Sequence, residues 1–118
     1  MKKIKIIKLS QEEINQLESS YKKSPLKDTS LKKLISDNEN VTLSILRQIK
    51  NLHKWNDIEN MVDYVSIIKK TEGATEFIEL NDKEISIVLD VFDGAVKSGK
   101  VNGVAMEKIV EVYKEFKL

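Results

Sequence analysis

The densest apolar pattern of the chain lies in residues 77–118, which read FIELNDKEISIVLDVFDGAVKSGKVNGVAMEKIVEVYKEFKL. The first four residues favour a short strand. Asn81, followed three residues later by Glu84, forms a capping box, which is a frequent start of a helix. Apolar side chains then recur with the period of one helix face, at Ile85, Val88, Leu89, Phe92 and Val96. This stretch therefore predicts a strand followed by an amphipathic helix.

A second helix of the same kind is expected after a tight connection. Gly99 is a suitable helix stop, and Asn102-Gly103 favours a turn. The same apolar spacing then returns at Met106, Ile109, Val110, Tyr113 and Phe116. Because two amphipathic helices joined by few residues pack antiparallel, the sequence predicts a C-terminal helical hairpin whose apolar stripes form the core.

An N-terminal strand is expected to pair with the strand that opens this stretch. Residues 2–9 are Ile-rich and partly alternating, and their predicted partner is residues 76–80. Opposite charges facing each other across the pair would stabilise it; they are Lys3, Lys5 and Lys8 on one segment and Glu76 and Glu79 on the other. Since a two-stranded sheet is marginal alone, helices must cover one face.

Further amphipathic helices are predicted between these strands. Pro25 ends the first, and the last ends near Gly73. Their predicted capping residues are Ser10, Thr29 or Ser30, Thr42 and Asp57. The helix that begins at Asp57 carries one apolar stripe, which comprises Ile58, Met61, Val62, Val65 and Ile68.

The whole chain, residues 1–118, is thus predicted to form a single α+β domain that is predominantly helical. We expect five or six amphipathic helices, a small two-stranded sheet (residues 2–9 with 76–80) and the C-terminal helical hairpin. Residues 6–14 (IIKLSQEEI) and 77–85 (FIELNDKEI) have similar patterns. They indicate either two strand–helix units related by approximate symmetry or only a common local sequence pattern.

The composition argues against several kinds of chemistry. The 118 residues include no Cys, and His53 is the only histidine, so disulfides, thiolate catalysis and Cys-ligated metals are excluded. No glycine-rich phosphate loop and no calcium-loop pattern is present. Carboxylates occur in pairs that are typical of solvated helix faces and helix N-termini, at Glu12/Glu13, Asp82/Glu84 and Asp90/Asp93. We therefore expect no catalytic, metal or cofactor-binding residues.

Charge and hydropathy bear on location and partners. The net charge of +1 gives no general attraction to polyanions. No apolar run approaches the roughly 20 residues of a membrane span, and Lys5 and Lys8 interrupt the apolar N-terminus, which argues against a signal peptide. We expect a cytoplasmic protein without membrane contact. The strong excess of Lys over Arg is typical of AT-rich coding sequences, as in low-GC bacteria and their phages.

Residues 31–55, which read LKKLISDNENVTLSILRQIKNLHKW, resemble a helix-turn-helix: a short helix, a polar turn and a second helix capped by Thr42. In that motif the second helix enters the major groove of DNA, and Arg47 and Gln48 suit base edges. The turn is longer and more acidic than the motif usually has. The residues expected to face outward from the second helix are Thr42, Ser44, Arg47, Gln48 and Lys50.

The lack of catalytic patterns favours a non-enzymatic function. We expect a small accessory or inhibitor-like protein that acts through protein–protein interaction, either with another protein or by self-association. The alternative is a helix-turn-helix regulator that binds DNA through residues 31–55. A third class, an enzyme that uses only carboxylates and lysines, has no motif of its own here.

Overall fold

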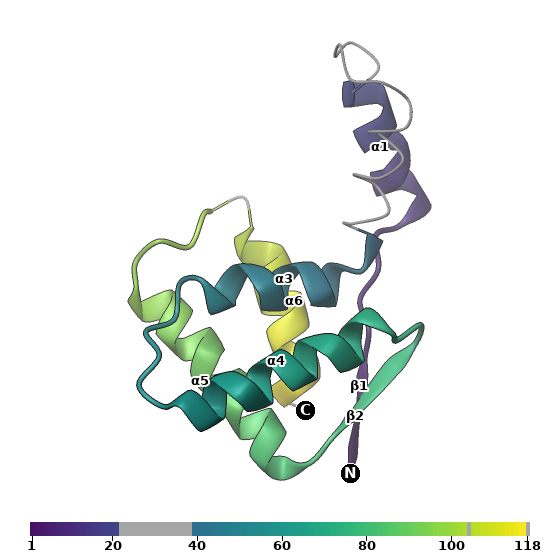
Figure 1. Ribbon diagram of the computed structural model, residues 1–118. Helices are drawn as coiled ribbons and strands as arrows, with labels where there is room; N and C mark the ends of the chain where they lie inside the picture. Colours follow the sequence, from purple (N-terminus) through teal and green to yellow (C-terminus); the bar gives the residue numbers. More distant parts are fainter. Residues whose placement is uncertain (22–38, 104, 118) are drawn as a thin grey trace.

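The computed structural model describes residues 1–21, 39–103 and 105–117 (Figure 1). Its elements, in chain order, are β1 (Lys2–Lys5), α1 (Gln11–Tyr21), α3 (Val41–Lys50), α4 (Ile58–Glu72), β2 (Phe77–Leu80), α5 (Asp82–Lys97) and α6 (Met106–Lys117). Five helices and one two-stranded sheet in the described part confirm the predominantly helical α+β class. The helix predicted at residues 31–35 lies outside the described residues.

The predicted strand pair is confirmed. β1 and β2 run antiparallel, with Lys2 opposite Leu80 and Lys5 opposite Phe77. The central pair is Ile4 opposite Ile78, and both side chains are buried against the helices.

The predicted charge pattern across the sheet holds only in part. Lys3 lies opposite Glu79, whereas Lys5 lies opposite Phe77 and Lys8 forms a bridge with Asn40 at the start of α3. The chain therefore leaves the sheet after residue 6 and turns toward α3, and this turn removes Lys8 from the glutamates of the second segment.

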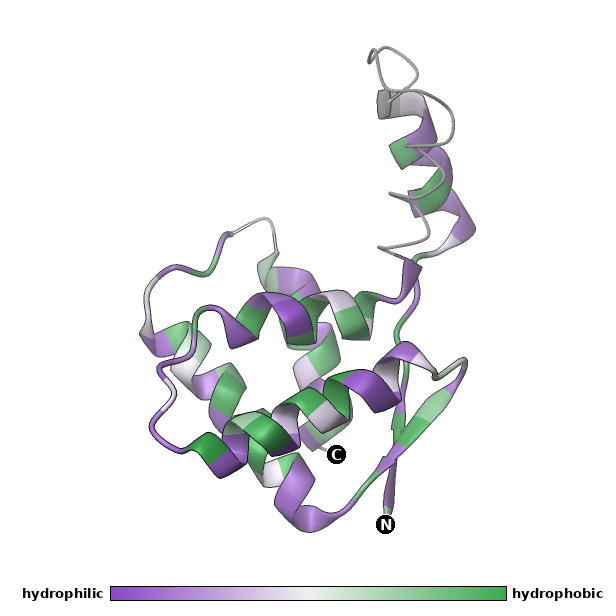
Figure 2. Cartoon of the chain, in the orientation of Figure 1, coloured by the Kyte–Doolittle hydropathy of each residue, from purple (hydrophilic) through white to green (hydrophobic). Residues whose placement is uncertain are grey.

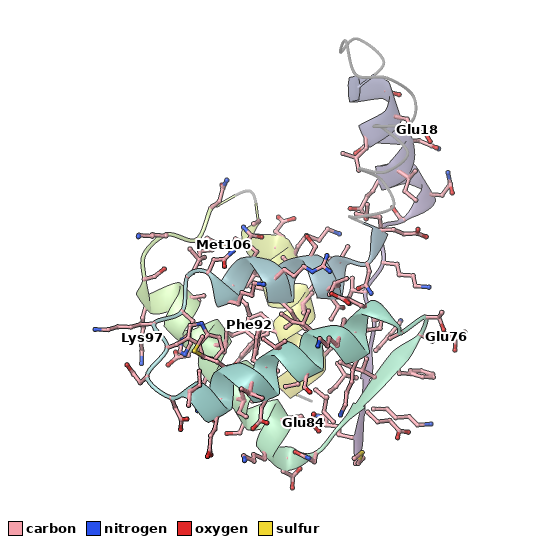
Figure 3. All side chains as sticks on the ribbon, in the orientation of Figure 1. Glu18, Glu76, Glu84, Phe92, Lys97 and Met106 are labelled. Carbon is pink, nitrogen blue, oxygen red and sulfur yellow. The ribbon has the colours of Figure 1, made fainter. Side chains whose placement is uncertain are left out.

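The hydrophobic core lies among α3, α4, α5 and α6, and the sheet runs alongside them (Figure 1). α3 and α5 are central, because each of them contacts the other three helices of this group. We call these four helices and the sheet the body of the molecule. Figure 3 shows Phe92 inside this body, whereas Lys97 and Met106 lie at its periphery. Burying one large apolar side chain stabilises a fold by roughly 1.5–3 kcal/mol. The buried side chains with the largest volumes are Tyr64, Phe116, Ile4, Leu46, Ile49, Ile67 and Leu80.

The C-terminal hairpin is confirmed, but its buried faces differ from the prediction. Asn81 and Glu84 form the capping box, and Gly99 adopts a φ of 70° just after α5. Three side chains of the predicted stripes are substantially exposed: Val96 (61%), Met106 (55%) and Val110 (43%). α5 packs against α3, α4 and α6 at once, and Val96 lies outside its buried face. α6 buries Ile109, Val112 and Phe116, so Met106 and Val110 lie outside its buried face. The side chains buried in addition to the prediction are Ile87, Val91, Ala95 and Val112.

The start of α3 differs from the predicted start at Thr42. Asn40 is the N-cap, and its Oδ1 accepts a hydrogen bond of 2.9 Å from the Leu43 N–H. Thr42 lies in the first turn, is fully buried, and its Oγ1 accepts a bond of 2.8 Å from the Ile7 N–H. Three backbone bonds hold the same region together: the Ile7 carbonyl accepts from the N–H groups of Val41 (2.9 Å) and Thr42 (3.3 Å), and the Glu39 carbonyl accepts from the Leu9 N–H (3.0 Å).

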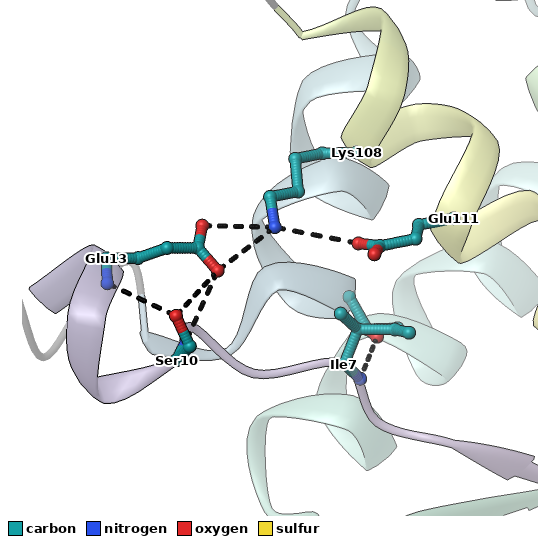
Figure 4. A network of polar contacts seen from close by, with 6 residues as sticks. Ile7, Ser10, Glu13, Lys108 and Glu111 are labelled. Carbon is teal, nitrogen blue, oxygen red and sulfur yellow. Dashed lines mark hydrogen bonds and ion pairs between the residues drawn. The ribbon is translucent and has the colours of Figure 1, made fainter.

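α1 extends away from the four-helix body (Figure 1). The predicted cap is present, because Ser10 and Glu13 hydrogen-bond each other reciprocally. Figure 4 shows how Glu13 reaches the body: its carboxylate pairs with Lys108 of α6 at 3.0 Å, and Lys108 also lies 3.6 Å from Glu111. The hydrogen bond from Lys108 lowers the pKa of Glu13.

The two segments with similar sequence, residues 6–14 and 77–85, thus share a capped helix start but not a packing environment, since α5 is buried in the body.

Candidate functional site

α4 carries two apolar faces, and only one of them is covered. The inner face is fixed by specific contacts: the Tyr64 hydroxyl donates a buried hydrogen bond of 2.6 Å to the Leu46 carbonyl, and the Tyr64 ring packs against Trp55. Burial raises the pKa of the Tyr64 phenol well above its usual range. The buried residues of this helix are Tyr64, Ile67, Ile68 and Thr71.

The opposite face of α4 holds an exposed apolar row, which we call the outer stripe: Ile58, Met61, Val62 and Val65. Their side chains are 70%, 39%, 61% and 48% exposed, respectively. The sequence correctly grouped these four residues on one stripe, but it placed Ile68 with them, and Ile68 is buried with the inner face. Green segments along α4 in Figure 2 mark this concentration of apolar residues.

The outer stripe forms a continuous surface. Ile58, Val62 and Val65 follow each other at intervals of four and three residues, so they line up along one side of the helix. A shallow groove of about 340 Å³ runs over them and is completed by Ser66 and Lys69. Contiguous exposed apolar surface of this kind marks interaction sites in soluble proteins.

Charged side chains around the outer stripe fall into two groups. Three ion pairs tie α4 to neighbouring helices: Asp63 with Lys83 (3.6 Å), Lys70 with Glu84 (2.9 Å) and Glu72 with Arg47 (2.6 Å). By contrast, Glu59 and Lys69, at opposite ends of the helix, form no ion pair with any other described residue. The charges of α4 without an ion pair among the described residues are therefore acidic at its start and basic at its end, where Lys69 borders the groove.

A second apolar surface lies between α5 and α6. A groove of about 460 Å³ is lined mainly by apolar side chains from both helices, and Asp90, Asp93 and Lys117 border it. Its more exposed members are Val96 and Val110. Val96 and Val110, two of the three hairpin residues that were wrongly predicted to be buried, thus line this α5/α6 groove.

A cavity of about 580 Å³ is lined in part by His53. The imidazole packs edge-on against Trp55, and its Nδ1 is buried without a hydrogen-bond partner among the described residues. Three carboxylates line the cavity: Asp57, Asp90 and Asp93. Asp57 caps α4, and Asp93 pairs with Lys97 at 2.9 Å.

The residues proposed for DNA contact do not share one exposed face. The prediction that Thr42 faces outward is wrong, because its hydroxyl is buried against Ile7. Arg47 and Gln48 are exposed, but Arg47 is held by Glu72. Ser44 and Lys50 are half-buried, and the first helix of the predicted motif lies outside the described residues.

Two further features of the described residues bear on function. The described residues contain no group of three or more His, Asp or Glu side chains that could hold a metal ion. None of their helices combines the length and the apolar character needed to cross a bilayer.

Comparisons with protein-family models, with curated proteins and with solved structures found no match for this chain. The outer stripe is therefore the feature from which a function can be argued. Sequence reasoning grouped its residues but did not predict their exposure. The signal was available: residues 58–68 hold more apolar side chains than a single helix face takes, which is three to four per two turns.

Proposed function

We propose that this is a small, non-enzymatic accessory or inhibitor-like protein that acts through protein–protein interaction, and that the outer stripe of α4 is its binding surface. The observation that supports the proposal is the exposure of Ile58, Met61, Val62 and Val65 on a helix whose other face is buried. A protein that keeps four large apolar side chains in water on one side of one helix has a surface suited to being covered.

The spacing of the stripe fits helix recognition. Partners that cover an amphipathic helix take up anchors at intervals of three and four residues, as Ile58, Val62 and Val65 provide. Burying each of these side chains contributes roughly 1.5–3 kcal/mol. α4 is capped at both ends by Asp57 and Gly73 and fixed by Tyr64, so the surface is already ordered before binding and little conformational entropy is lost.

The lack of Cys fits a reducing, cytoplasmic setting, and we include that location in the proposal. The DNA-binding alternative is not proposed, because no contact favours it: Thr42 is buried and Arg47 is paired with Glu72.

Substitution at Val62 tests the proposal. Val62→Asp places a charge in the centre of the outer stripe but on an exposed side chain, so the thermal stability should change little. Ser86→Asp, on the exposed side of α5, is the matched control. Complexes isolated with tagged protein from its native cells should retain their specific partner with the Ser86→Asp variant and lose it with Val62→Asp.

Hydrogen exchange of the isolated complex localises the contact. Protection should appear in residues 58–69 and should be small over α6. Equal retention of the partner by both variants, or protection confined to another helix, would overturn the assignment of the outer stripe. A sequence-selective, nanomolar affinity for duplex DNA that Arg47→Ala abolishes would favour the regulator instead.

A further inference from the structure

We infer that the outer stripe is self-complementary and that its occupant is a second copy of this chain, bound through two antiparallel α4 helices related by a two-fold axis. This inference rests on the proposed function, because it names the partner of the same surface. It is drawn from the order of charged and apolar residues along α4.

The apolar spacing is compatible with an antiparallel pair. Val62 and Val65 are the centre of the row, with Ile58 four residues before it and Lys69 four residues after it. When Val62 of each copy lies opposite Val65 of the other, Ile58 falls opposite Lys69. Such an isologous contact uses the same patch on both copies, as two-fold dimers do.

The charges select the antiparallel direction. In this alignment the aliphatic stem of Lys69 covers Ile58 of the other copy, and its ammonium group reaches the carboxylates of Asp57 and Glu59. A parallel pair would instead bring Lys69 close to its own equivalent and Glu59 close to its own equivalent, and like charges in register are destabilising.

The other charges of α4 do not take part. Asp63, Lys70 and Glu72 are each paired within the chain, with Lys83, Glu84 and Arg47. Glu59 and Lys69 have no ion pair among the described residues, and they are the two that the antiparallel alignment brings together twice, once at each end of the pair.

The size of the outer stripe determines the affinity that we expect for the dimer. A helix of 15 residues is about 22 Å long, and its outer face offers fewer residues than the 20–30 per partner of a standard interface. We therefore expect a reversible dimer with a dissociation constant in the micromolar range, about 1–100 μM.

Sedimentation velocity of the full-length chain, from about 1 to 500 μM at low salt, tests this pairing. The wild type should shift from monomer to dimer, and Val62→Asp should remain monomeric. Glu59→Lys and Lys69→Glu should each weaken the dimer about tenfold, because each creates like-charge contacts at both ends. The double variant Glu59→Lys/Lys69→Glu should dimerise more tightly than either single variant, since swapping both charges rebuilds the pair between positions 59 and 69 at both ends, while the unchanged Asp57 keeps the dimer weaker than that of the wild type.

Matched substitutions away from α4 serve as the control. Glu76→Lys and Lys100→Glu, both exposed, should leave the dissociation constant unchanged, and circular dichroism should show that every variant is folded. A wild type that stays monomeric at 500 μM, or a double variant that fails to recover, would overturn the self-pairing. If the wild type is monomeric but Val62→Asp still loses a partner in native cells, the inference fails while the proposed function stands. If Val62→Asp changes neither, both fail.

Discussion

Replacing Gly94 with alanine tests how closely α5 packs against His53. A Cβ atom at Gly94 would overlap the imidazole ring, with Cε1 at 2.8 Å and Cγ at 3.1 Å. The ring centroid of His53 lies 4.7 Å from that of Trp55, and the Trp55 centroid lies 5.3 Å from that of Tyr64. A shift of His53 away from Gly94 therefore disturbs the packing of Trp55 and, through it, the inner face of α4.

Two opposing effects decide the change in the free energy of unfolding. Alanine is favoured over glycine in a helix interior by about 1 kcal/mol, whereas overpacking a filled site costs about 1–3 kcal/mol. Because the overlap involves the ring itself, we expect Gly94→Ala to be destabilising by about 1 kcal/mol net. In a His53→Ala background the overlap is gone, and the same substitution should be stabilising by about 1 kcal/mol.

Urea unfolding followed by far-UV circular dichroism of the four proteins gives the coupling energy between the two sites, which we expect to be about 2 kcal/mol. Gly73→Ala is the matched control, because the nearest atom to its new Cβ would be the Lys70 carbonyl at 3.9 Å. Its effect should be the same with and without His53. A Gly94→Ala variant that is stabilised equally in both backgrounds would show that His53 does not pack against α5 as described.

Three further predictions concern the buried contacts. Thr42→Val removes the acceptor of the Ile7 N–H and should cost about 1–3 kcal/mol in urea melts; Thr42→Ser keeps the hydroxyl and should cost less, so equal losses would contradict the hydrogen bond. Burial raises the pKa of Tyr64, so the unfolded chain loses the phenol proton at a lower pH than the folded chain does. The contribution of Tyr64 to the free energy of unfolding is therefore full below about pH 10 and falls as the pH rises above that value. Thermal melts of Tyr64→Phe should show a shallower fall above that pH, and an unchanged profile would refute the burial of the phenol. Phe116→Ala removes a ring that is 1% exposed and should cost about 3–5 kcal/mol; a loss below about 1 kcal/mol would mean that α6 is not part of the core.

Local signals in the sequence predicted the elements well. Asn81 and Glu84 marked the start of α5, Gly99 marked its end, and the Ile-rich N-terminus marked β1. Each of these features acts within a few residues through a hydrogen bond or a backbone conformation. Because these signals involve only neighbouring residues, the starts and ends of the elements can be predicted from a single sequence.

The sequence could not predict which helix faces are covered, because that depends on elements distant along the chain. α4 has two apolar faces, and Leu46 and Trp55 select the inner one through their contacts with Tyr64. Thr42 looked like an N-cap, but its hydroxyl accepts a hydrogen bond from the backbone N–H of Ile7, which is far away in the sequence. The candidate site was missed for the same reason: exposure of the outer stripe follows from what packs on the opposite side of the helix.

The backbone bonds that join Ile7 and Leu9 to residues 39–41 have a consequence for the architecture. Leu9 and Glu39 lie far apart in the sequence, yet a backbone hydrogen bond of 3.0 Å, from the Leu9 N–H to the Glu39 carbonyl, joins them. The two ends of the intervening sequence are therefore held together by contacts that belong to the core side of the molecule. The entropy of closing a segment between two fixed ends grows only slowly with its length, so a change in the number of residues between Leu9 and Glu39 should cost the core little.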